Sequence, residues 1–241
     1  MKKIKLVTVA LALTTSLLVL GGCGAAKPAT TAAGDAKVFQ GVGQASNLRN
    51  TGKLDAAGGK KYSANIVTAS ALFDNDGKII NVLFDGLEIG SPNGAKEGAI
   101  IFSGWPTQAG FNGAAATTDE SSTKEVANWK SKRVRGDAAY GMNWSVQFDL
   151  YQELFKGKTV AEAEQWFAKN TSDLNGKPLV KDAEKPEDQA KFAKLTDAEK
   201  TSLADVTSGA SISLKDGHGD FMSALKNAFE NKKEVTITPA K

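Results

Sequence analysis

The sequence predicts an α+β fold, because β-rich segments dominate its first half and helix patterns dominate its second half. An Asn-Asp-Gly turn at 75–77 lies between two β-rich runs, 62–73 and 78–85, which is typical of a β-hairpin. A further strand is expected at 37–42. The strongest helix signal is an aromatic stripe at i, i+4, i+7 and i+11. The stripe comprises Trp144, Phe148, Tyr151 and Phe155.

The remaining elements follow from local signals. Residues 86–122 are rich in Gly, Ala, Ser and Thr and are expected to form an extended loop region. The pattern Thr-x-x-Glu at Thr159 and again at Thr196 is a capping box, which opens a helix. An amphipathic pattern over 221–229 predicts the last helix, and 235–238 is expected to return as a strand. The aromatic stripes are expected to pack in the core.

The charge balance argues against a nucleic-acid-binding function. The chain has 30 Lys+Arg and 27 Asp+Glu, a formal net charge of +3. Lys2, Lys3 and Lys5 lie in the expected leader, so the chain from Cys23 onward has 27 basic and 27 acidic residues. Nucleic-acid binding needs a basic excess on one face. We therefore expect no nucleic-acid partner.

A single His and a single Cys exclude many catalytic and metal sites by counting. Zinc and iron–sulfur sites built on Cys need several thiolates, and a Ser-His-Asp triad could use only His218. No Gly-x-Ser-x-Gly elbow surrounds Ser208 or Ser211, which argues against a hydrolase. Asp74 and Asp76 are interpreted as turn residues, because the other ligands of a calcium loop are missing. No resident metal is expected.

The first residues predict a lipoprotein. Residues 1–22 combine a basic start with an apolar run shorter than the roughly 20 residues that span a membrane. The run ends in Leu-Gly-Gly-Cys at 20–23, which resembles the bacterial lipobox, whose Cys receives a diacylglyceryl group. An ordinary signal peptide is the alternative. Residues 23–36 are small and polar and are expected to be a flexible tether. We expect a domain attached by lipid on Cys23 to the extracytoplasmic face of the cell membrane.

The segment 205–219 is the strongest candidate for cofactor chemistry. It is rich in Gly and hydroxyl residues and precedes the expected last helix. Free backbone N–H groups and the helix dipole favour a phosphate at such a position. An ordinary loop with an N-cap is the alternative.

Within this segment, Asp205-x-x-Ser208-Gly209-Ala210-Ser211 resembles the acceptor motif of the FMN-binding domain family, Asp-x-x-(Ser/Thr)-Gly-Ala-(Thr/Ser). The family's domains occur in extracytoplasmic electron-transfer proteins, including subunits of sodium-pumping quinone oxidoreductases and lipid-anchored flavoproteins. The resemblance implies that a membrane-associated, magnesium-dependent flavin transferase cleaves FAD and joins FMN to Ser211 by a phosphoester bond. The other four residues would form the recognition loop.

The resemblance extends more loosely over 62–85 and 129–155, and it implies an FMN-binding-domain-like fold for 37–241. This chain departs from the usual pattern by having serine rather than threonine at position 211. Serine keeps the hydroxyl that the attachment requires.

Several neighbouring residues have two interpretations each. His218, seven residues beyond Ser211, is expected either near the flavin or on a solvent-facing helix N-terminus. A basic run comprises Lys130, Lys132, Arg133 and Arg135. It either contacts the flavin phosphate, a partner or anionic headgroups, or is a solvated strand or loop. Four further residues either stack on the flavin ring or pack in the core: Trp129, Tyr140, Met142 and Trp144.

These features together predict a membrane-anchored flavoprotein with FMN on Ser211. It would pass electrons from a membrane donor, such as a quinone-linked dehydrogenase, to an extracytoplasmic or extracellular acceptor. The flavin performs the redox step, so an electron carrier without catalytic side chains is favoured over an enzyme. One alternative is a lipid-anchored protein that binds a small molecule or partner without covalent cofactor. Another is a reductase that reduces a specific acceptor on its flavin.

Overall fold

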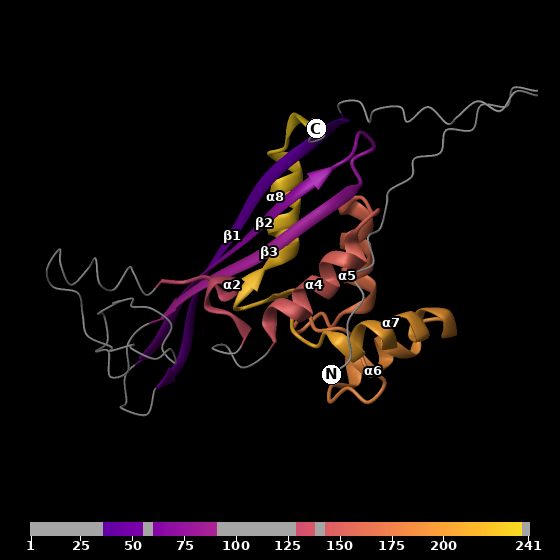
Figure 1. The fold of residues 1–241 in the computed structure, drawn as a ribbon. Coiled ribbons are helices and arrows are strands. Elements are labelled where there is room, and N and C mark those ends of the chain that lie inside the picture. The colour runs from indigo at the N-terminus through magenta and orange to yellow at the C-terminus, as the bar shows by residue number, and fades with distance from the viewer. Residues whose placement is uncertain (1–35, 55–59, 91–128, 138–142, 238–241) are drawn as a thin grey trace, which may run out of the picture. The chain divides into compact units, whose positions relative to one another are not determined.

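An antiparallel sheet with the strand order β3-β2-β1-β6 is the scaffold on which the helices pack (Figure 1). The computed structural model describes residues 36–54, 60–90, 129–137 and 143–237. The strands are β1 (Ala36–Leu54), β2 (Lys60–Phe73), β3 (Ile79–Gly90) and β6 (Lys233–Ile237). Helices follow in the second half, so the predicted α+β class is confirmed.

The β2–β3 hairpin has the predicted turn. The Asp74 Oδ1 atom accepts hydrogen bonds from the backbone N–H groups of Asp76 at 2.9 Å and Lys78 at 2.8 Å. Gly77 adopts φ 76°, a conformation that favours glycine. The Asp74 carboxylate therefore stabilises the turn itself, as the turn interpretation requires.

Two strands are longer than predicted. β1 runs to Leu54 rather than ending at position 42, and β3 runs to Gly90. The expectation of a loop is therefore wrong for 86–90, where Gly86 pairs with Val67 and Gly90 with Ser63 of β2. Pairing with a neighbouring strand overrides weak local propensity. The rest of the expected loop, 91–122, lies outside the described residues.

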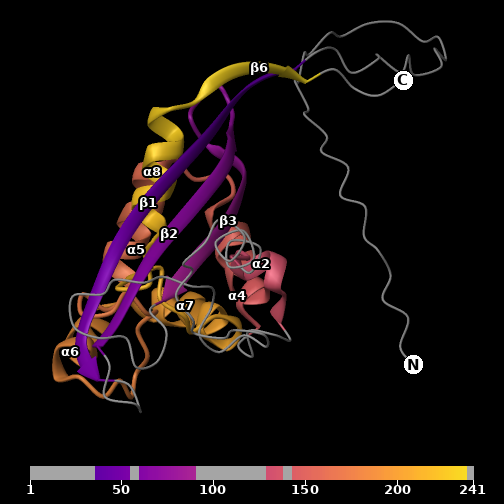
Figure 2. The same ribbon diagram turned by 90° about the vertical axis from the view of Figure 1, so that its left-hand side faces the viewer.

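The helices that begin at 144, 160, 197 and 221 start where the local signals predict. The short helix at 132–135, where the basic run was expected to be a strand or loop, and the helix at 186–193 were not predicted. Both capping boxes are formed, at Thr159 with Glu162 and at Thr196 with Glu199. The last predicted strand is β6, which pairs with the start of β1 (Figure 2). The helices are α2 (Lys132–Arg135), α4 (Trp144–Phe155), α5 (Val160–Asn170), α6 (Pro186–Ala193), α7 (Asp197–Gly209) and α8 (Phe221–Glu230). A two-stranded ribbon, β4 (Lys215–Asp216) with β5 (Gly219–Asp220), leads into α8.

One face of the sheet carries the core. Along β2, Val67, Ala69, Ala71 and Phe73 are buried and the residues between them are only partly buried. Helix α8 packs against β1 and β2, and α4 packs against β3 (Figure 1). The predicted aromatic stripe of α4 is buried in this core, which confirms the packing interpretation. Its rings contact β3 and α8 through Phe84 and Phe221.

Helix α8 approaches β1 at two glycines. A Cβ atom on Gly41 would lie 1.9 Å from the carbonyl oxygen of Ala228, and one on Gly43 would lie 2.1 Å from that of Ala224. The β2 residues paired with these glycines are Ala71 and Ala69. The small side chains therefore let the helix backbone rest directly on the sheet.

The capping box of α7 gives the protein a stability that depends on pH. The Lys169 ammonium and the Thr196 backbone N–H, 2.8 Å from the carboxylate, lower the pKa of Glu199 from 4.5 to about 2. A pKa lowered on folding stabilises the fold above pH 4.5, and this stabilisation is lost as the pH falls toward 2. We expect Glu199→Gln to melt at a lower temperature than wild type at pH 7 and at a similar temperature near pH 2. Equal melting differences at both pH values, measured by circular dichroism, would contradict this assignment.

The expected leader 1–22, Cys23 and the expected tether up to position 35 lie outside the described residues. The last tether position, Ala36, is the first residue of β1. Within the ranges that the structure describes, no helix is long and apolar enough to cross a membrane.

Candidate functional site

The acceptor-like motif is mostly helical. Asp205, Ser208 and Gly209 lie in the last turns of α7, and Ala210 is its C-cap. The prediction of a loop over 205–209 is therefore wrong, because the helix opened by the Thr196 capping box continues through this segment. Asp205, Ser208 and Gly209 are exposed, and Ala210 is buried.

The predicted position of a phosphate at the N-terminus of the last helix is also wrong. Helix α8 begins at Phe221, ten residues after Ser211. The Asp220 side chain caps it, accepting a hydrogen bond from the Ser223 backbone N–H at 2.9 Å. A carboxylate therefore takes the place that a phosphate would need, and Ser211 follows the C-terminal end of α7 instead.

Helix α4 fixes the backbone at Ser211. The Gln147 Oε1 atom accepts hydrogen bonds from the backbone N–H groups of Ser211 at 2.8 Å and Ile212 at 3.0 Å. One turn further along α4, the Tyr151 hydroxyl donates to the Ile212 carbonyl at 2.9 Å. Burial raises the pKa of Tyr151, so its hydroxyl stays protonated as a donor. These three hydrogen bonds hold the backbone of 211–212 against α4.

The Ser211 hydroxyl differs from its two nearest serine neighbours. Ser208 Oγ donates to the Asp205 carbonyl at 2.7 Å, and Ser213 Oγ donates to the Asn175 carbonyl. Ser211 is exposed, and its hydroxyl has no hydrogen-bond partner in the part of the chain that the structure describes. Of these three serines, Ser211 therefore combines exposure with a hydroxyl that no described residue engages.

Ser211 lies at the wall of a cavity of about 300 Å³. This volume is at the lower end of the range for small-molecule sites, about 300 to 1,000 Å³. Cationic, aromatic and hydroxyl side chains from distant segments meet here, including three besides Ser211 that the sequence indicated: Lys132, Trp144 and His218. The lining residues are Lys132, Trp144, Lys177, Ser211, Ile212, Ser213, Asp216, His218 and Phe221.

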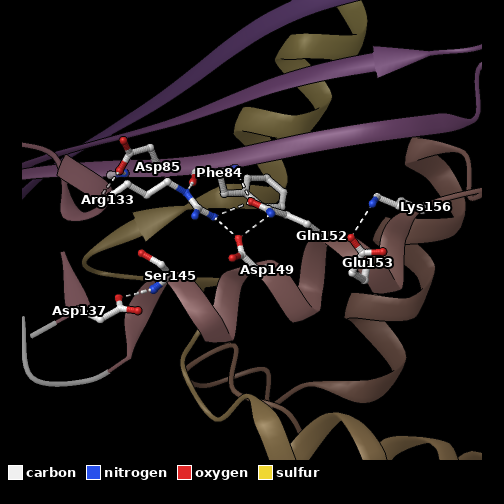
Figure 3. Close-up of polar contacts among 10 residues, drawn as sticks. Phe84, Asp85, Arg133, Asp137, Ser145, Asp149, Gln152, Glu153 and Lys156 are labelled. Atoms are coloured by element: carbon white, nitrogen blue, oxygen red, sulfur yellow. Dashed lines mark hydrogen bonds and ion pairs between the residues drawn. The ribbon is translucent and has the colours of Figure 1, made fainter. Parts of the chain in front are cut away.

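Arg133 holds the basic run in place and does not line the cavity. Its guanidinium donates to the Asp149 carboxylate at 2.8 Å, the Gln152 amide oxygen at 2.7 Å and the Phe84 carbonyl at 2.5 Å (Figure 3). Its backbone N–H donates to Asp85 at 3.2 Å. These contacts fix α2 to β3 and α4, and therefore fix its neighbour in sequence, Lys132.

Lys132 is buried, contrary to the expectation of a solvated basic run. It is 5% exposed, and its Nζ lies 5.7 Å from the centroid of the Trp144 ring. Burial lowers the pKa of Lys132, while the charges of Glu88 and Asp216 oppose that shift. The lysine therefore has an acidic neighbour, Asp216, on the same cavity wall.

His218 is exposed and lines this cavity, and it lies in the turn between β4 and β5 rather than at the expected helix N-terminus. Its backbone N–H donates to Asp216 Oδ1 at 2.6 Å, and its Nδ1 lies 3.3 Å from Asp216 Oδ2. Burial would raise the pKa of Asp216, but the hydrogen bonds from His218 outweigh it and lower the pKa. Asp216 is therefore an anion in the cavity wall near neutral pH.

The four residues considered for ring stacking have different outcomes. Trp144 is 2% exposed and stacks on Phe148 with ring centroids 4.1 Å apart, so its packing role is confirmed. Trp129 is partly buried and does not line the cavity. Tyr140 and Met142 lie outside the described residues.

Two site residues, Lys177 and Gln147, were not predicted from the sequence. Lys177 belongs to the segment between α5 and α6, and no motif marks it. Gln147 lies three residues after Trp144, on the turn of α4 that faces Ser211. The only feature in the sequence that could have indicated Gln147 is its position as a polar residue beside the apolar stripe of α4.

A larger cavity of about 450 Å³ lies along α5 and α7. It contains Trp166 and the Lys169–Glu199 ion pair, but none of the sequence-predicted site residues. Its charged groups are already used in the capping contacts of the helices. The smaller cavity beside Ser211 is therefore the better candidate.

The residues around Ser211 fit a flavin mononucleotide. Lys132 and Lys177 supply positive charge to the cavity wall, and the nearly buried rings of Phe221 and Trp144 form its apolar part. Ser211 supplies an exposed hydroxyl. Asp216 is the one carboxylate that lines this cavity among the described residues.

The chain is similar to a chlorophenol reductase of Desulfitobacterium hafniense. The two are 41% identical over 219 residues, which cover 83% of this chain and 59% of that protein. The chain thus spans about three fifths of the length of this relative. No family model matches the chain, and no solved structure matches it.

Proposed function

We propose that this chain belongs to the FMN-binding domain family and carries FMN on Ser211 as a membrane-anchored electron carrier. The observation that carries the proposal is the exposed hydroxyl of Ser211 beside a cavity lined by two lysines. Among the described residues, this hydroxyl has no hydrogen-bond partner. The motif of residues 205–211 places the same serine at the attachment position. The lipid anchor on Cys23 and the extracytoplasmic location are part of the proposal.

The proposed attachment is a phosphoryl transfer catalysed by a flavin transferase. The Ser211 oxygen attacks the FMN phosphorus of FAD, forming the Ser–O–P bond and breaking the bond between the two phosphates. AMP leaves, and the proton of the hydroxyl passes to solvent. The exposed positions of Asp205, Ser208 and Gly209 support recognition by the transferase, because a maturation enzyme must reach its motif.

The bound flavin supplies the redox chemistry, and the chain holds it. Such a flavin would supply two-electron redox chemistry between a membrane quinol and an oxidised extracytoplasmic acceptor. Lys177 would counter the phosphate charge, and the Gln147 and Tyr151 hydrogen bonds would keep the attachment point fixed. No side chain needs to act as acid or base.

The relative's name, chlorophenol reductase, supports a redox role for this chain. It also favours a second candidate, in which the flavin itself reduces a chlorophenol. A reduced flavin in this cavity would supply the two electrons and the proton with which a C–H bond replaces the C–Cl bond, and chloride would leave. The chain spans 59% of the relative, so an electron carrier, which needs only a flavin and its attachment site, is our first proposal.

The test is to produce the full chain with and without a flavin transferase, and to measure intact mass and in-gel fluorescence under denaturing conditions. We expect one FMN per chain only with the transferase, and a diacylglyceryl adduct on Cys23 in membrane fractions. Unmodified, colourless protein in both cases would contradict the proposal and favour a binding protein without covalent cofactor. Reoxidation of the dithionite-reduced protein by a chlorophenol, with chloride release, would favour the second candidate.

A further inference from the structure

We infer that Lys132 and Asp216 form an opposed charge pair that sets the reduction potential of the flavin in this cavity. The inference rests on the proposed function, because it needs a flavin on Ser211. It assigns a role to two residues that the acceptor motif does not include.

The contacts of the surrounding elements fix the position of Lys132. Lys132 is 5% exposed and lines the cavity, and it interacts with the acidic residues Glu88 and Asp216, as a buried lysine requires. The contacts of Arg133 with β3 and α4 and the Ser131 side chain, which accepts from Val134 N–H at 3.3 Å, fix the short helix that carries it. The Lys132 ammonium is therefore confined to the cavity wall and does not move freely in solvent.

Asp216 comes from a different element and lines the same cavity. It lies on β4, in the ribbon before α8, and it accepts two hydrogen bonds from His218. Lys132 and Asp216 interact electrostatically with each other, and Lys132 also interacts with Glu88, Asp85 and Arg135. Because the two groups lie on separate elements, α2 and β4, each charge can be removed by its own single substitution.

Opposite charges act on a flavin in opposite directions. Reduction by two electrons and one proton leaves a negative charge on the ring system, so a nearby cation stabilises the reduced form and a nearby anion destabilises it. Buried charges are screened less by water and salt than exposed ones, which makes the effect of Lys132 large. Lys132 therefore raises the reduction potential and Asp216 lowers it.

The experiment is a spectroscopic redox titration of the full chain loaded by the flavin transferase, with loading checked by intact mass. The variants are Lys132→Gln, Asp216→Asn and the double variant, and Lys130→Gln is the matched control, since Lys130 is an exposed lysine outside the cavity. We expect Lys132→Gln to lower the equilibrium constant for reduction at least tenfold, about 30 mV for a two-electron couple. Asp216→Asn should raise this equilibrium constant, and the double variant should return it toward the wild-type value. Lys130→Gln should leave the constant unchanged.

The sign of the shifts separates an electrostatic role from a structural one. Shifts of the same sign in Lys132→Gln and Asp216→Asn, or no shift in either, would overturn the inference while leaving the proposed function intact. Absence of the FMN adduct in wild type would overturn both. If Lys132→Gln does not fold, Lys132→Arg, which keeps the charge, should retain the wild-type reduction potential. The direction of the potential shift in Asp216→Asn alone then tests the inference.

Discussion

Replacing Ser211 with alanine is expected to abolish the covalent flavin while leaving the fold unchanged. The side chain is exposed, and its hydroxyl has no hydrogen-bond partner among the described residues, so its removal breaks no contact that they supply. The contacts that fix this segment come from the backbone N–H groups of Ser211 and Ile212, which the variant retains. Intact mass after co-expression with the transferase should show no FMN adduct, and circular dichroism should match wild type.

Two further variants make this result specific. Ser211→Thr keeps a hydroxyl at the same position and should keep the adduct. Ser213→Ala is the matched control, because Ser213 lines the same cavity but its hydroxyl is bonded to the Asn175 carbonyl. An adduct that survives in Ser211→Ala, or that disappears in Ser213→Ala and not in Ser211→Ala, would contradict the assignment.

Replacing Gly43 with alanine is expected to cause a large loss of stability. Its Cβ would lie 2.1 Å from both the Ala224 carbonyl oxygen and the Ala228 nitrogen, which are backbone atoms of α8. A rotamer change cannot relieve such an overlap, so helix and strand must separate. Overpacking of this kind costs about 3 kcal/mol, a large part of the roughly 5 to 15 kcal/mol that stabilises a domain. Urea unfolding followed by circular dichroism should show a much lower midpoint.

Gly86→Ala is the control for this prediction. Gly86 lies on β3 of the same sheet, but a Cβ there would have its nearest contact at 3.6 Å, an ordinary packing distance. We expect its urea midpoint to remain close to that of wild type. Equal losses of stability in Gly43→Ala and Gly86→Ala would contradict this prediction. They would show that replacing any strand glycine lowers the stability, whether or not α8 lies close to it.

Local signals predicted the helices well because their causes lie within a few residues. The stripe at Trp144 and Phe148 and the capping boxes at Thr159 and Thr196 each depend on spacings of three or four positions. The same locality explains the error at 205–209. Small and hydroxyl residues have low helix propensity, but a helix already started by a capping box continued through them.

The site could be predicted only in part, because the tertiary fold brings its residues together. The motif indicated Ser211, and the single His drew attention to His218, but nothing in the sequence brings Lys132 and Lys177 to the same cavity. Those two lysines are 45 residues apart in the chain and meet only after α4 and the segment after α5 pack beside the ribbon. The extension of β1 to Leu54 likewise depends on pairing with β2.

The hydrogen bonds that Gln147 and Tyr151 make at 211–212 have a consequence for affinity. With the backbone held, a group attached to Ser211 has only the short serine side chain as its linker to the cavity. Short linkers give effective concentrations in the millimolar range, so docking of the attached flavin becomes an intramolecular event. In the proposed flavoprotein, a cavity of about 300 Å³ would need fewer contacts to hold the attached flavin than to hold free FMN, because the covalent bond would already bring the two together.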